Sequence, residues 1–107
     1  MGLVDNARRI NKDQGPGGLW RWAVAGEGAH AKAHRFNACA RFAANQRDQA
    51  KTEHEAAIWG ERRKTYARER DSFERRYERR HDTKLPESIH FQELIYHDPP
   101  HAHVAIA

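Results

Sequence analysis

A long run without proline is the feature that most limits how this chain can fold. Between Ala29 and His81 there is no proline, and Gly60 is the only glycine. Alanine, arginine, glutamate and glutamine dominate this run, and all are good helix formers. The sequence therefore predicts one long helix over residues 29–82, or a pair of helices joined near Gly60. An unbroken helix would reach ~80 Å at ~1.5 Å per residue, which is longer than a compact domain of this size is wide.

Two stripes of apolar residues appear when this run is placed on a helix with ~100° per residue. One stripe is aromatic and consists of Trp59, Tyr66, Phe73 and Tyr77. The other repeats at every seventh position, lies roughly opposite, and consists of Phe36, Ala43, Ala50 and Ala57. Either a turn near Gly60 brings both stripes onto one core, or a straight helix touches different neighbours along its length. We favour the straight helix.

The segments on either side of the predicted helix differ from it in composition. Residues 1–28 contain a Gly-rich hinge, GPGG at 15–18, followed by Trp20 and Trp22, and are predicted to form an N-terminal arm. Residues 83–107 are predicted to form a linker, a short helix after Pro86 and an extended tail rich in His and Pro. The expected fold class is therefore mostly α, an elongated long helix with extended arms at both ends rather than a compact globule.

The supply of core-forming side chains is small for a chain of this length. Of the 107 residues, 38% are hydrophobic and 32% are charged, and the mean hydropathy is −1.04. A chain this polar buries little apolar surface to offset the entropy of ordering its backbone. We therefore expect the long helix to be ordered by partners rather than by its own core.

Positive charge and aromatic side chains coincide in residues 61–80. This stretch holds nine of the Lys and Arg residues and five of the acids, which accounts for the whole net charge of +4. Arginine suits bidentate contacts to carboxylate or phosphate, and Trp, Tyr and Arg are the usual anchors of protein interfaces. The predicted partner-binding residues are Trp20, Trp22, Trp59, Arg62, Arg63, Tyr66, Arg70, Phe73, Arg75, Arg76 and Tyr77.

No arrangement of residues typical of catalysis, cofactor binding or metal binding stands out in the sequence. Cys39 is the single cysteine. It is not a candidate nucleophile, because no histidine is placed to activate it. His30 and His34 are spaced for one helix face but lack an evident third ligand, and the tail segment HDPPHAH has no second cluster. The glycine segments match neither a Walker loop nor GxGxxG. We therefore predict a protein that is not an enzyme and has no cofactor and no metal site.

Nucleic acid ranks below protein among the expected partners. An Arg-rich helix with interleaved aromatic residues is typical of RNA-binding segments. However, five acids alternate with the bases in residues 61–80, and acids repel phosphates. On a helix, Glu74 falls beside the aromatic stripe. Acidic surfaces of other protein subunits are therefore the expected partners, with nucleic acid as the second choice.

The expected function is that of a non-catalytic accessory subunit that bridges neighbouring proteins in a large assembly. No apolar run is long enough to span a bilayer, and the N-terminus lacks the apolar core of a secretory signal. We therefore expect an intracellular location. A mitochondrial respiratory-chain or ATP synthase complex is the first choice. A microtubule lattice in the axoneme or cytoplasm comes second, and a ribosome-type, RNA-bound subunit comes third.

One family has a similar order of segments. The succession of GPGGLW, KTEHEAAI and a charged helix resembles the mitochondrial ATP synthase inhibitor protein, a small, basic, helical family. That family carries an acidic inhibitory segment, flanked by bases, after its glycines. Residues 19–35 of this chain are LWRWAVAGEGAHAKAHR instead, so we carry over no residue role from the family.

Overall fold

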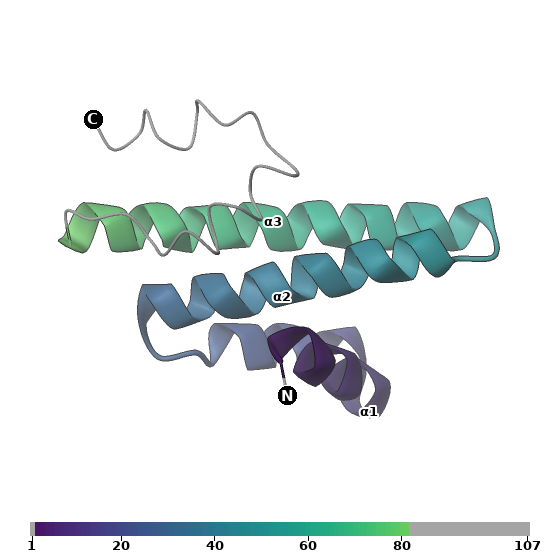
Figure 1. Ribbon diagram of the computed structural model, residues 1–107, viewed down its shortest axis with the longest axis horizontal. Helices are drawn as coiled ribbons and strands as arrows, with labels where there is room; N and C mark the ends of the chain where they lie inside the picture. The colour runs from purple at the N-terminus through teal and green to yellow at the C-terminus, as the bar shows by residue number, and fades with distance from the viewer. Residues whose placement is uncertain (1, 82–107) are drawn as a thin grey trace.

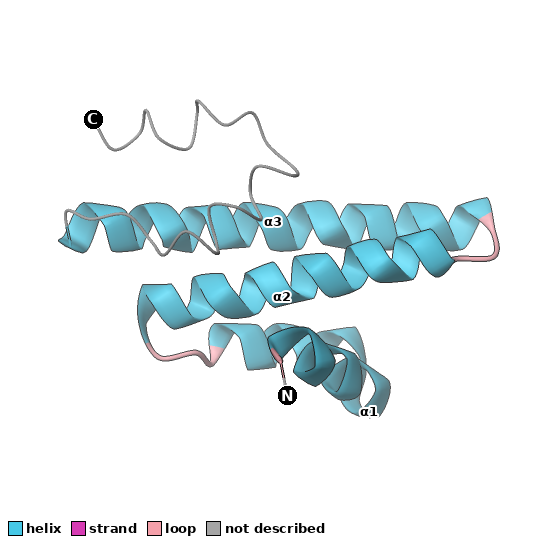
Figure 2. Ribbon diagram, viewed as in Figure 1, coloured by secondary structure: helices cyan, strands magenta, loops and turns pink. Residues whose placement is uncertain are grey.

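Three helices make up the regular structure of residues 2–81, which is the part of the chain that the computed structural model describes (Figures 1 and 2). They are α1 (Leu3–Val24), α2 (Gly28–Gln49) and α3 (Glu53–His81). Helix α2 lies between the other two, as Figure 1 shows. Within residues 2–81, no helix combines the length and apolar character needed to cross a membrane.

A tight turn at residues 50–52 joins α2 to α3. Ala50 leaves the helical conformation for an extended one, with φ −64° and ψ 141°. The backbone N–H of Glu55 then donates a hydrogen bond to Thr52 Oγ1 at 3.1 Å. This is the pattern of a helix N-terminus capped by threonine with glutamate three positions later. The local cap therefore starts α3 afresh, and α2 and α3 run antiparallel as a hairpin.

The sequence placed a possible break near Gly60. The observed break lies about two helical turns earlier, at residues 50–52. Gly60 itself lies inside α3. Because of the turn at 50–52, Phe36 and Ala43 lie in the same core cluster as Tyr66, and Trp59 and Phe73 pack against that cluster. The straight helix that we favoured is therefore wrong. The alternative, in which a turn brings both stripes onto one core, is the one observed.

The N-terminal segment is helical rather than an extended arm. Helix α1 is interrupted at Gly15, whose φ of 76° and ψ of −175° lie outside the helical region. Such a conformation is essentially restricted to glycine. Pro16 follows, and its fixed φ suits the first turn of a new helical part. The hinge expected at 15–18 is therefore a kink inside a helix. The predicted C-terminal arm, residues 83–107, lies outside the described residues.

The core sits where the three helices meet. Its largest fully buried apolar side chains are Phe36, Phe42 and Leu19, beside the thiol of Cys39. Ala40 and Ala43 are buried and have small side chains. They leave room between the helix backbones, which the aromatic side chains fill.

The overall dimensions contradict the predicted elongated shape. The radius of gyration is 13.8 Å and the extents are 43 × 28 × 21 Å. A compact domain of ~100 residues has a radius of gyration of ~13 Å. The longest extent corresponds to α3 alone, because 29 residues span ~43 Å at ~1.5 Å per residue. The aromatic stripe of α3 folds back onto α2, so the prediction that the chain is not a compact globule is wrong.

Candidate functional site

The side of α3 that faces away from α2 is predominantly cationic over residues 68–80. The exposed residues in this range are all arginines: Arg68, Arg75, Arg76, Arg79 and Arg80. We call these five residues the arginine face. Glu69 is the one acid in the range that is half-buried rather than buried. A surface on which positive charge predominates attracts anions.

The other acids of this range are turned inward. Asp71, Glu74 and Glu78 are 8%, 3% and 4% exposed. They are three and four residues apart, which places them on one side of a helix. The arginine face occupies the other side. Over residues 68–80, helix α3 therefore buries three of its four acids and exposes five of its six arginines.

Arg70 is the exception among the bases, because it is completely buried. Its guanidinium donates from Nε to Asp71 Oδ1 at 3.0 Å, and its Nη2 lies 2.9 Å from the same oxygen. Its Nη1 donates to Oδ1 of Asn37 on α2 at 3.0 Å. A buried charge is tolerated only when it is paired and hydrogen-bonded. Arg70 therefore connects α2 with α3 inside the hairpin.

The predicted aromatic anchors pack largely within the chain itself. Trp20 meets Phe36 edge-on at 5.0 Å between ring centroids, and Phe73 stacks on Phe36 at 5.9 Å. Trp59 meets Phe42 edge-on at 5.4 Å. Such pairs contribute about 0.5–1.5 kcal/mol each beyond their buried area. Much of the aromatic surface that we expected to be ordered by partners is ordered by α2.

A shallow groove of about 350 Å³ lies between α1 and α3. Three predicted residues line it, namely Trp20, Arg62 and Tyr66. The guanidinium of Arg62 also lies 4.6 Å from the centroid of the Trp59 ring, which is a cation–π contact. Burial is the main cause that raises the pKa of Tyr66 to about 12. The complete lining is Pro16, Gly17, Trp20, Glu61, Arg62, Thr65 and Tyr66.

The lining of this groove suits an apolar side chain with a charge at its edge. Its aromatic walls offer apolar contact, and Arg62 and Glu61 place one charge of each sign on its lining. The Thr65 hydroxyl donates to the backbone carbonyl of Glu61 at 3.1 Å. That hydrogen bond turns the hydroxyl toward its own helix, and the same oxygen accepts a hydrogen bond from Arg68 Nη2 at 3.3 Å.

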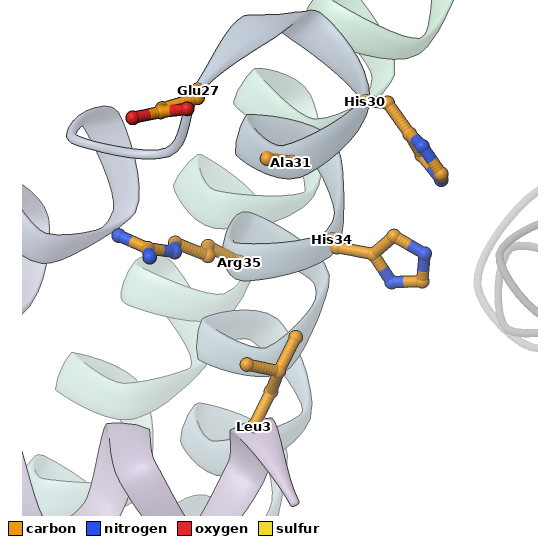
Figure 3. A pocket seen from close by; sticks show the side chains of 6 residues that line it. All are labelled: Leu3, Glu27, His30, Ala31, His34 and Arg35. Carbon is orange, nitrogen blue, oxygen red and sulfur yellow. The ribbon is translucent and has the colours of Figure 1, made fainter.

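A second depression, of about 450 Å³, holds the two histidines of α2 (Figure 3). His30 and His34 point to the same side of the helix, with ring centroids 4.8 Å apart. Burial, followed by repulsion from His30, holds the pKa of His34 below its usual value. Within residues 2–81, no three His, Cys, Asp or Glu side chains gather in a position to hold a metal ion.

The eleven residues predicted to bind partners are thus divided among several environments. Arg75 and Arg76 are exposed on the arginine face, whereas Tyr66 and Arg70 are buried. The remaining seven are half-buried, and they are Trp20, Trp22, Trp59, Arg62, Arg63, Phe73 and Tyr77.

Sequence reasoning missed three members of the arginine face, namely Arg68, Arg79 and Arg80. The spacing of Asp71, Glu74 and Glu78 could have revealed them, because it separates the acids from these arginines on a helical wheel.

Comparison with protein-family models, with curated proteins and with solved structures finds no match to this chain. The side chains of the described residues are therefore the basis for assigning a function. Two surfaces are available for it, the arginine face and the groove between α1 and α3.

Proposed function

We propose that this chain is a non-catalytic accessory subunit that attaches to an anionic surface of a larger assembly through the arginine face. One observation supports this function above all. Every exposed residue between 68 and 80 is an arginine, while three of the acids in the same range are buried. A helix that needed only solubility would expose both signs of charge, as mixed surfaces do.

The charge of the folded part strengthens this proposal. Residues 2–81 carry eighteen Lys and Arg against eleven Asp and Glu, a net charge of +7. A field of this sign steers anionic partners toward the surface and raises the association rate, most strongly at low ionic strength. The arginine face is its densest exposed part, so the partner is expected to dock there.

The groove between α1 and α3 offers a second contact. It is lined by Trp20 and Tyr66 together with Arg62, and it borders the arginine face, because Arg68 Nη2 donates a hydrogen bond to Thr65 Oγ1 in its lining at 3.3 Å. An apolar side chain of a neighbouring protein would fit its aromatic walls. Two adjoining surfaces of different chemistry, one cationic and one largely aromatic, would let the subunit contact two neighbours. The respiratory-chain, ATP synthase and microtubule settings stay predictions from the sequence.

The proposal is tested by sedimentation of the tagged full chain in lysates of its native cells. A face variant replaces four arginines with glutamine and leaves Arg76, which stacks on Phe73 at 4.8 Å. Its substitutions are Arg68→Gln, Arg75→Gln, Arg79→Gln and Arg80→Gln. A control variant removes the same charge from exposed arginines elsewhere, by Arg8→Gln, Arg9→Gln, Arg21→Gln and Arg41→Gln.

We expect the wild-type chain and the control variant to sediment with a large assembly, and the face variant to move to the slow fractions of a free small protein. Circular dichroism of each purified variant checks that all three are equally helical. A face variant that stays in the heavy fractions would contradict the proposal, as would a wild-type chain that sediments alone.

A further inference from the structure

We infer that the anionic partner of the arginine face is the phosphodiester backbone of a nucleic acid. This inference rests on the proposed function, because it names the chemistry that the same face recognises. The sequence alone ranked nucleic acid below acidic protein, and the objection was the acids interleaved in residues 61–80. Asp71, Glu74 and Glu78 are buried in the fold, so three of the five acids are withdrawn from the surface that a partner would meet. Glu61 is exposed but lies outside residues 68–80, and Glu69 is half-buried.

The arginine face lacks the apolar centre that a protein partner would need. Protein interfaces place apolar and aromatic groups at their centre, with charge at the rim. Here every exposed residue from 68 to 80 is an arginine. The exposed large hydrophobic residues of the described chain are Leu3, Val24 and Ile58, and all lie outside this range. Contacts to phosphates require only charge and hydrogen-bond donors, and the arginine face supplies both.

The spacing of the arginines also suits a polyphosphate strand. Residues 68 to 80 span ~18 Å along α3 at ~1.5 Å per residue. One strand of duplex DNA carries a phosphate about every 3.4 Å along the axis, so ~18 Å covers about five phosphates. The face offers five guanidinium groups over that length, and each presents a planar fork that matches phosphate oxygens.

Backbone contacts of this kind carry no information about base sequence. The face should therefore bind RNA and DNA of any sequence, and the steep salt dependence of counterion release should govern its affinity. Five phosphate contacts predict a slope of log K against log salt between about −3.5 for a single strand and −4.5 for a duplex.

The test is fluorescence anisotropy with the full chain over a series of salt concentrations. Three labelled probes are compared: a single-stranded RNA of mixed sequence, a DNA duplex of mixed sequence, and polyglutamate with the same number of charges as the RNA. The wild-type chain, the face variant and the control variant are each titrated. Comparing the affinities for the RNA and DNA probes shows which of the two nucleic acids the chain prefers.

We expect the wild-type chain and the control variant to bind a nucleic acid at least tenfold more tightly than polyglutamate, with the slope given above. The face variant should lose at least tenfold in affinity and most of the slope. Equal or tighter binding of polyglutamate would overturn the nucleic-acid inference and leave the proposed function standing. Failure to bind any of the three probes would overturn both, and equal RNA binding by the face variant would overturn the role of these arginines.

Discussion

Arg70 is a positive charge at the centre of a helical hairpin, with no exposed surface. Its guanidinium reaches Asp71 on its own helix and Asn37 on α2. Its position on the helix distinguishes it from the exposed arginines on either side, because it lies four residues after Tyr66 and three before Phe73, on the aromatic stripe. Its role depends on Asn37, which is 33 positions away in the sequence. Only the fold brings the two residues together.

Arg70→Ala should strongly destabilise the protein, because it removes the guanidinium that donates hydrogen bonds to the buried Asp71 carboxylate and to the Asn37 amide oxygen. Removing one member of a buried pair costs ~3–5 kcal/mol, whereas Arg75→Ala on the exposed face should stay within ~0.5 kcal/mol of the wild type. Urea unfolding followed by circular dichroism measures both variants. Arg70→Lys should fall between them, since it keeps the charge and loses the fork. An Arg70→Ala variant as stable as Arg75→Ala would contradict this role.

Two buried acidic groups predict how stability changes at high pH. Burial raises the pKa of Cys39 from 9.0 to about 12, and chiefly burial raises the pKa of Tyr66 from 10.0 to about 12. The unfolded chain therefore loses these protons first. Stability should be unaffected by them below pH ~9 and should fall between pH ~9 and ~12, by at most ~1.4 kcal/mol per pH unit for each group.

Urea unfolding at a series of alkaline pH values measures this fall, and Cys39→Ala should reduce its slope. The substitution also leaves a small cavity, but that cost is the same at every pH. A slope that Cys39→Ala leaves unchanged would show that the thiol does not contribute.

At the scale of the helices, composition predicted the type of structure but not its boundaries. The absence of proline over residues 29–81 correctly indicated helix. The break was misplaced because Gly60, the only glycine in the run, was taken as its position. A glycine inside a helix costs only ~1 kcal/mol and need not end the helix. The capping pattern of Thr52 and Glu55 marks where a new helix starts, and it would have located the break. The helix over residues 3–24 was missed because its GPGG segment was taken as a hinge within an extended arm rather than as a kink within a helix.

Gly15→Ala tests the kink in α1. Gly15 has a φ of 76°, where a side chain costs about 1–3 kcal/mol of strain. Gly17→Ala is the matched control, because Gly17 lies in the same helix and an added Cβ there would meet only the end of the Arg21 side chain at 3.5 Å. Thermal unfolding should show Gly15→Ala melting earlier than the wild type and Gly17→Ala melting at the same temperature or later. Equal effects of both substitutions would show that the backbone at Gly15 is not strained by a side chain.

At the scale of the whole molecule, the hairpin turn determines which surfaces remain for partners. A straight helix would have presented its aromatic stripe to neighbours. The turn at 50–52 directs that stripe onto α2, so exposed arginines are left as the most distinctive surface. Aromatic and basic character could be located from the sequence, yet which of the two would stay outside depended on the position of one turn. The candidate site was therefore predicted for Arg75 and Arg76, and missed for Arg68, Arg79 and Arg80.

The same turn changes what the isolated chain should do. An elongated rod without a core would be unfolded in dilute buffer, as the composition suggested. A hairpin with Phe36, Phe42 and Leu19 buried inside one chain should instead be helical and unfold cooperatively. Because these core contacts lie within one chain, the midpoint of thermal unfolding should not change over a roughly hundredfold range of protein concentration. A midpoint that rises with concentration would mean that a second copy completes the core, and a gradual loss of helix without a transition would mean that the partner does.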